Sequence, residues 1–97
     1  MKTIREIKAI LAKHREELKS RFKVKEIGIF GSYVRETQSN RSDVDILVEF
    51  KESISLLDLV KLENFLTSLL EVKVDLVPKE DIRMELKERI LKEAIYV

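Results

Sequence analysis

Two stretches of the sequence, Ile27-Gly28-Ile29-Phe30-Gly31-Ser32 and Ser42-Asp43-Val44-Asp45-Ile46-Leu47-Val48, decide the fold. The first belongs to an apolar run from Val24 to Phe30 that is rich in β-branched residues, and it predicts a strand followed by a tight turn at Gly31-Ser32. The second alternates between apolar and other residues as far as Phe50. Residues at every second position of a strand share a face, so this stretch predicts a strand with Asp43 and Asp45 on one face.

Helical patterns flank these two strands. Thr3 and Glu6 have the spacing of a capping box, and the apolar residues that follow predict an amphipathic helix to about residue 20. After the second strand, Ser53 or Ser55 can cap another helix. Its apolar positions between Leu56 and Leu70 cover more than half of its circumference, which predicts a broadly buried helix.

The C-terminal third completes the predicted fold. Val72 to Val77 reads as a third strand closed by Pro78, Asp81 opens a last helix, and Ile95-Tyr96-Val97 could add a short edge strand. This order of elements predicts an α/β fold, in which a small mixed β-sheet has helices packed on one face. The other face of the sheet would then be left to hold a site.

Length and composition exclude several classes of protein. We expect a single domain spanning residues 1–97, and the formal net charge of +1 disfavours direct binding to nucleic acid. The chain has no Cys and one His, His14, which excludes disulfides, thiolate chemistry and histidine-based zinc sites. No apolar run is long enough to cross a membrane, and the N-terminus lacks the pattern of a signal peptide, so we expect a cytoplasmic protein.

The aspartates of the second strand suggest a metal site. Asp43 and Asp45 project from the same face about 6–7 Å apart, near enough to reach one or two cations. Oxygen-only ligands favour Mg²⁺ or Mn²⁺ over zinc. Asp75 adds a third carboxylate within an apolar strand, where a divalent cation would offset the cost of burying its charge. Alternatively, Asp75 is exposed to solvent, or paired with Lys73 or Lys79.

The Gly31-Ser32 turn has the chemistry of a phosphate-binding site. Because Gly31 has no Cβ, the backbone can approach a phosphate closely, and the free N–H groups that follow favour anions. Ser32 adds a hydroxyl donor, and Arg35 can reach the same phosphates or pair with Glu36. The sequence contains neither of the glycine-rich motifs of P-loop and Rossmann nucleotide sites.

Taken together, Gly31-Ser32, Arg35 and the segment from Ser42 to Val48 resemble the signature of the DNA polymerase β-like nucleotidyltransferases. Their spacing is similar to that of the minimal nucleotidyltransferase (MNT) family, the antitoxin half of prokaryotic HEPN/MNT pairs. The resemblance extends from about Ile27 to Val77, and the Glu93-Ala94-Ile95 ending extends it further. One residue departs from the family pattern, since Glu36 stands where the family commonly has Gly, and this predicts a more helical turn after Arg35.

The resemblance implies both an activity and a set of roles. Asp43 and Asp45 would bind two Mg²⁺ ions (Mn²⁺ is possible), Asp75 would bind the ion at the nucleophile, and these three are the implied catalytic residues. Gly31, Ser32 and Arg35 would bind the triphosphate of ATP. Proteins of this family transfer AMP to a tyrosine of the HEPN ribonuclease toxin and silence it, which implies a toxin partner in a hetero-oligomer.

Two other functions remain open from the sequence. One is a noncatalytic antitoxin that neutralises its toxin by occlusion. The other is a small-molecule nucleotidyltransferase of the aminoglycoside type, although such enzymes have an added substrate domain.

Overall fold

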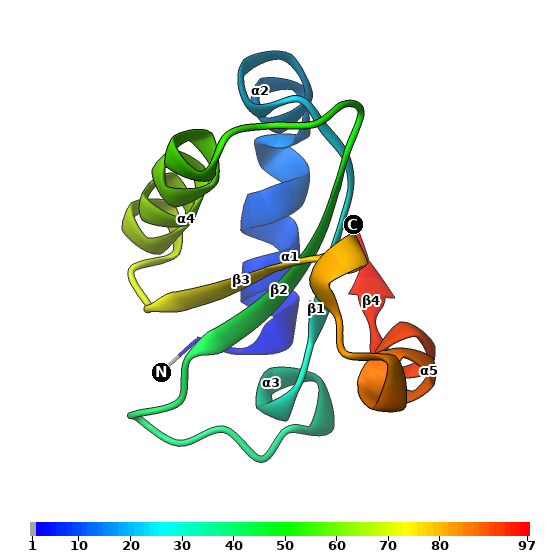
Figure 1. Ribbon diagram of the computed structural model, residues 1–97. Coiled ribbons are helices and arrows are strands. Elements are labelled where there is room, and N and C mark those ends of the chain that lie inside the picture. Colours follow the sequence, from blue (N-terminus) through cyan, green and yellow to red (C-terminus); the bar gives the residue numbers. More distant parts are fainter. Residues whose placement is uncertain (1) are drawn as a thin grey trace.

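The computed structural model describes residues 2–97, which form a four-stranded mixed sheet surrounded by helices (Figure 1). The elements in chain order are α1 (Ile4–Lys13), α2 (Arg15–Phe22), β1 (Val24–Phe30), α3 (Ser32–Arg35), β2 (Val44–Phe50), α4 (Leu56–Leu70), β3 (Val74–Pro78), the 3₁₀ turn η1 (Lys79–Asp81), α5 (Met84–Glu93) and β4 (Ile95–Tyr96). The strand order is β3-β2-β1-β4. β1 runs antiparallel to β2 and β4, and β2 runs parallel to β3, so the predicted α/β class with a mixed sheet is confirmed.

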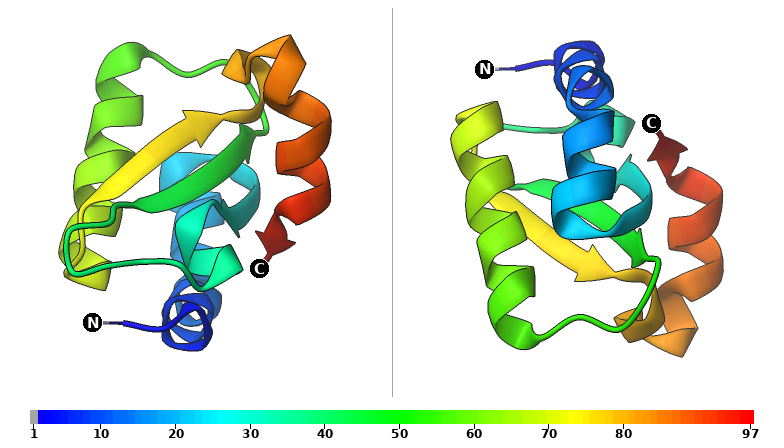
Figure 2. Two further views of the ribbon diagram at one scale, coloured as in Figure 1. Left: turned by 90° about the horizontal axis from the view of Figure 1, so that it is seen from below. Right: turned by 90° about the horizontal axis from the view of Figure 1, so that it is seen from above.

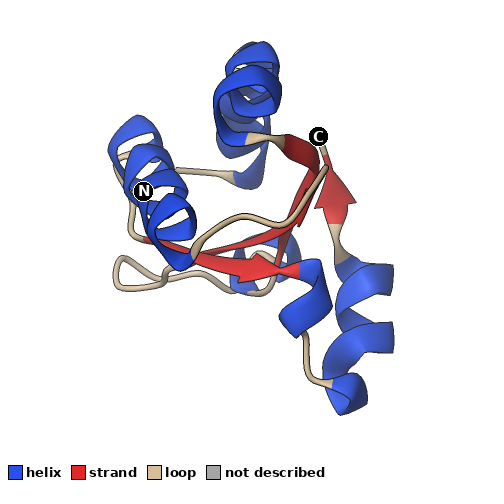
Figure 3. Cartoon of the chain, turned by 45° about the horizontal axis from the view of Figure 1, so that its top comes forward, coloured by secondary structure: helices blue, strands red, loops and turns tan. Residues whose placement is uncertain are grey.

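The core lies between one face of the sheet and the helices α1, α2 and α4. The alternation predicted for the second strand is confirmed, because Val44, Ile46 and Val48 are fully buried in this core. The helices contribute apolar residues at helical spacing, namely Ile7, Leu11, Leu18, Leu62, Leu66 and Leu70. Figure 3 shows the strands as a layer between these helices and α5.

One helix departs from the prediction that the helices pack on one face, because α5 partly covers the opposite face of the sheet. Leu47, which points away from the main core, and Ile90 of α5 are both buried outside that core cluster. α5 lies on the other side of the sheet from α1 and leads the chain from the β3 edge back to β4 (Figures 1 and 2). The short edge strand predicted at the C-terminus is confirmed, since Ile95 and Tyr96 pair with β1.

The N-terminal helix differs from the prediction of a single element. The Thr3–Glu6 capping box is present, but the helix breaks at His14, which has φ −104° and ψ 15°. The His14 ring is within hydrogen-bonding distance of the Ile10 carbonyl (Nδ1 to O, 3.0 Å), and its backbone N–H donates to Leu11. These contacts tighten the turn and separate α1 from α2.

Two predictions about the later helices are wrong in part. α4 begins after Ser55, which caps it, but it is not broadly buried: Leu56 and Leu57 are 77% and 64% exposed. Asp81 does not open the last helix. It ends η1, and α5 starts only after Ile82 and Arg83, both extended. The chain turns here because it must leave the β3 edge and cross the sheet toward β4.

In residues 2–97, no helix has both the length and the apolar character that a bilayer span requires.

Candidate active site

The three aspartates singled out in the sequence lie at one end of the sheet. Because β2 and β3 are parallel, their N-terminal ends meet at the same edge, and Asp45 faces Asp75 directly in the register of the two strands. Asp43 immediately precedes β2. The residues on either side of Asp45 and Asp75 are buried in the core, namely Val44, Ile46, Val74 and Leu76. Asp45 and Asp75 therefore project from the opposite face of the sheet.

Asp75 is exposed, which matches one of the alternatives considered for it. The alternative of pairing with Lys73 or Lys79 is wrong, since neither forms an ion pair with Asp75 within residues 2–97 and the Lys79 ammonium lies 3.7 Å from Glu49. Asp75 is therefore accessible from solvent, whereas Asp45, which lies opposite it, is half-buried.

The electrostatics of Asp45 reflect this crowding of carboxylates. Burial, followed by the negative charges of Asp75 and Asp43, raises the pKa of Asp45 to about 6, and the Arg35 guanidinium opposes the rise. The ionised form of Asp45 is therefore disfavoured by its surroundings.

A divalent cation would reverse this balance. Within residues 2–97, no three Asp, Glu or His side chains converge closely enough to form a ready-made metal site. The donors nevertheless suit a hard cation, because they are carboxylates only and because their mutual repulsion is relieved when a positive charge lies between them. Asp43, Asp45 and Asp75 therefore fit Mg²⁺ or Mn²⁺ by their chemistry.

Gly31 brings the turn after β1 into contact with this group. Phe30, the last residue of β1, pairs with Asp45, so Gly31 follows at the same edge of the sheet. Gly31 has φ 80° and ψ −151°, and a Cβ on it would overlap the Asp45 carboxylate, with Cγ only 2.9 Å away. Glycine is needed here for its backbone conformation and for the absence of a side chain. The two halves of the sequence motif thus touch.

Glu93, which belongs to the ending that extends the resemblance but was given no role in the site, occupies the other side of this turn. Its Oε2 accepts a hydrogen bond from the Gly31 N–H (2.8 Å), and its Oε1 accepts one from Nη1 of Arg35 (2.7 Å). Burial alone would raise the pKa of Glu93, but the Gly31 hydrogen bond and the Arg35 guanidinium outweigh burial, so the pKa lies below the ordinary value. Arg35 therefore pairs with Glu93 and not with Glu36, the partner considered from the sequence.

The turn after Arg35 also differs from the prediction. Glu36 was expected to make it more helical, but Glu36 has φ 59° and ψ 35° and ends α3 in the left-handed conformation that glycine adopts most readily. The chain then reverses through the polar segment 37–42 toward Asp43. Ser32, at the start of α3, is only partly buried, and its carbonyl accepts a hydrogen bond from the Thr37 N–H.

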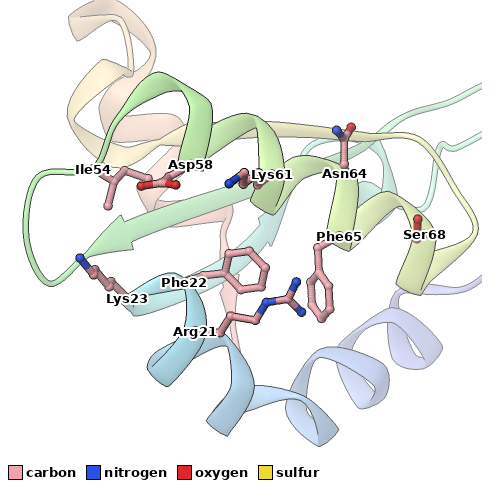
Figure 4. A pocket seen from close by; sticks show the side chains of 9 residues that line it. All are labelled: Arg21, Phe22, Lys23, Ile54, Asp58, Lys61, Asn64, Phe65 and Ser68. Atoms are coloured by element: carbon pink, nitrogen blue, oxygen red, sulfur yellow. The ribbon is translucent and has the colours of Figure 1, made fainter.

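Two surface cavities differ in their position relative to the aspartates. A cavity of about 380 Å³ borders Asp43 and is lined by Tyr33, Asn40, Arg41, Ser42, Asp43, Glu71, Val72 and Lys73. A larger one, about 560 Å³, lies between α2 and α4 (Figure 4). Arg21 stacks there on Phe22 and Phe65, at 4.9 and 5.4 Å from the ring centres. Asp43 lines the smaller cavity, whereas Asp45 and Asp75 line neither of the two.

Comparison with known proteins agrees with this geometry. A family model described as a nucleotidyltransferase domain matches residues 11–97. The chain belongs to this family. Protein adenylyltransferase MntA of Thermococcus cleftensis is 48% identical over 97 residues, which cover 100% of this chain and 98% of the relative. The family assignment and this relative identify the protein as an enzyme of the nucleotidyltransferase type.

Solved structures share the fold. One, described provisionally as a minimal nucleotidyltransferase, is 34% identical with a TM-score of 0.75, covering 92% of this chain and 93% of the other. A second, a toxin–antitoxin crystal structure with AMP-PNP, is 27% identical with a TM-score of 0.73, covering 93% of this chain and 70% of the other. The resemblance to minimal nucleotidyltransferases is therefore confirmed.

Proposed function

We propose that this protein is a Mg²⁺-dependent protein adenylyltransferase that transfers AMP from ATP to a tyrosine hydroxyl of a cognate HEPN toxin and thereby acts as its antitoxin. One observation carries the proposal: the Asp45 carboxylate lies against Gly31 and directly opposite Asp75. The turn proposed to bind phosphate and the carboxylates proposed to bind the cations are thus in contact, which supports transfer at a phosphorus atom.

The carboxylates have separate roles in this proposal. Asp43 and Asp45 would hold two ions and Asp75 would hold the one near the acceptor. Bound there, the ions would neutralise the triphosphate and make the acceptor hydroxyl more acidic. Because Asp75 is exposed, it is also placed to accept the proton of that hydroxyl as general base.

The turn residues would bind and orient the nucleotide. The Ser32 hydroxyl and the Arg35 guanidinium, whose side chain is 51% exposed, can donate hydrogen bonds to triphosphate oxygens. The acceptor oxygen then forms a bond to the α-phosphorus while the bond to the bridging oxygen breaks, so pyrophosphate leaves. Gly31 contributes by letting the turn approach Asp45, since its own N–H donates to Glu93.

An open sheet edge favours a macromolecular acceptor. Asp75 and Arg35 are both exposed, so a large partner could bring its hydroxyl to the carboxylates from outside. The name of the T. cleftensis relative and the toxin–antitoxin structure with a bound nucleotide analogue support a protein acceptor of this kind.

The proposal can be tested by co-expressing the protein with a HEPN partner and measuring the intact mass of that partner. We expect a mass increase of one or more AMP units on tyrosine with the wild type, and none with Asp45→Asn. Ser32→Ala should raise the KM for ATP without lowering the melting temperature, because within residues 2–97 Ser32 makes its hydrogen bonds through its backbone and not through its hydroxyl. An unmodified partner that is still inhibited would show occlusion in place of catalysis.

A further inference from the structure

The carboxylate of Glu93 joins three elements that are distant in the sequence. It stands at the end of α5, accepts the N–H of Gly31 in the turn after β1, and pairs with Arg35 at the end of α3. Its two oxygens serve different partners, so a single side chain fixes both the backbone of the turn and the guanidinium. Glu93 and Gly31 are 62 residues apart in the sequence.

The position of Glu93 is set by the sheet and not by a loop. Two residues later, Ile95 pairs with Ile29 of β1, and Ile29 lies two residues before Gly31. The register of β4 therefore places Glu93 beside Gly31. The Glu93 side chain is only 16% exposed, which is consistent with a fixed contact.

Arg35 is held by one end and is free at the other. Its Nη1 donates to Glu93, and the side chain remains 51% exposed. A guanidinium has five N–H donors in a planar fork, so an arginine anchored through one nitrogen can still bind an anion through the others. Anchoring also reduces the side-chain entropy that would otherwise be lost when a ligand binds.

We propose that Glu93 is a positioning residue for the nucleotide: it fixes the Gly31 turn and orients Arg35 so that the remaining guanidinium donors face the triphosphate. This inference rests on the proposed nucleotidyl transfer and adds a role for a residue of the C-terminal helix. Glu93 itself touches neither the substrate nor a metal ion in this account.

The contact between Glu93 and the Gly31 turn could also have the opposite effect and hinder nucleotide binding. A carboxylate that occupies the turn could act as a competitor of the phosphates, and its removal would then improve nucleotide binding. The fixed register of β4 and the low exposure of Glu93 favour positioning, because a competitor must be able to leave.

The test is the affinity for AMP-PNP with Mg²⁺, measured by calorimetry on the full chain. We expect Glu93→Gln to weaken binding about tenfold, the scale of one lost charge-assisted hydrogen bond. In the transfer assay the KM for ATP should rise while kcat changes little. Glu88→Gln is the matched control, because Glu88 lies on the same helix, is 83% exposed and pairs only with exposed Lys92.

A double-mutant cycle identifies the route of the effect. Because Glu93 acts in part through Arg35, the loss of affinity caused by Glu93→Gln should be smaller in an Arg35→Gln background than in the wild type. Additive losses would overturn the proposal, and so would unchanged or tighter binding by Glu93→Gln. Glu93→Asp keeps the charge but cannot span both partners, so it should also weaken binding and serves if Glu93→Gln does not fold. A wild type that binds no nucleotide would instead refute the proposed function.

Discussion

The α-carbon of Gly31 lies against the carboxylate of Asp45, so closely that a Cβ at position 31 would overlap it. This contact joins the turn after β1 to the start of β2, two segments separated by the polar stretch 37–42. It follows from the antiparallel register that pairs Phe30 with Asp45. The spacing of the motif in the sequence thus becomes a direct contact in the fold.

Gly31→Ala is expected to be strongly destabilising. An alanine would have to adopt a positive φ and displace the Asp45 carboxylate, which together should lower the free energy of unfolding by about 2 kcal/mol or more. Gly28→Ala is the matched control, because its Cβ would meet the Tyr96 ring at 3.2 Å and the Ile95 carbonyl at 3.3 Å, without a strained φ. Urea denaturation measures the free energy of unfolding of both variants. Equal losses at the two positions would contradict this account of Gly31.

Asp45→Asn should stabilise the protein in the absence of metal while abolishing activity. The amide removes a charge that burial and two neighbouring carboxylates disfavour. Because solvent screens part of this repulsion, we expect a gain of only about 1 kcal/mol. The melting temperature without and with Mg²⁺ checks this: the variant should melt higher without metal and should lose the stabilisation by Mg²⁺ that the wild type shows. A lower melting temperature without metal would contradict it.

The same carboxyl gives the stability an unusual dependence on pH. The pKa of Asp45 is raised from 3.8 to about 6, so the folded protein takes up this proton before the unfolded chain does. The contribution of Asp45 to the free energy of unfolding should therefore increase as the pH falls from about 7 to 5. Metal-free wild type and Asp45→Asn, compared by denaturant titration across this range, should converge as the pH falls. A constant difference between them would exclude the shift.

Glu36→Gly should raise stability. A residue other than glycine in the left-handed conformation costs about 1 kcal/mol, part of which glycine recovers, so we expect a gain of about 0.5–1 kcal/mol. Glu71 has a similar φ of 57° at the end of α4. Glu71→Gly should therefore give a similar gain in the free energy of unfolding, and the melting temperatures of both variants should rise. A loss of stability in Glu36→Gly would indicate a contact of the Glu36 side chain that outweighs the strain.

The strands and the aspartates could be predicted because their signals are local. The alternation around Val44 and Ile46 fixes which face is buried, and therefore which face carries Asp45. Asp75 lies between buried Val74 and Leu76 for the same reason. That Asp45 and Asp75 stand directly opposite each other required the strand pairing, which no local pattern contains.

The role of Glu93 could not be predicted, because it depends on long-range pairing. Only the antiparallel register of β4 against β1 brings Glu93 to Gly31. The sequence offered the resemblance of the Glu93-Ala94-Ile95 ending and a glutamate just before a predicted edge strand, and neither signal assigns Glu93 a partner. The break at His14 and the late start of α5 were missed for a related reason. The apolar period continues across His14 and already includes Ile82, while the backbone turns at both places.

Transfer of a radiolabel tests most directly the proposal that this chain transfers AMP to a protein. The purified protein, Mg²⁺, a HEPN partner and ATP labelled at the α-phosphate should yield labelled tyrosine on the partner. Asp43→Asn, Asp45→Asn and removal of Mg²⁺ should each abolish the label, while Asp58→Asn, the same change at an exposed position of α4, should not. A partner that stays unlabelled by the wild type, yet loses its ribonuclease activity in the complex, would contradict the claim.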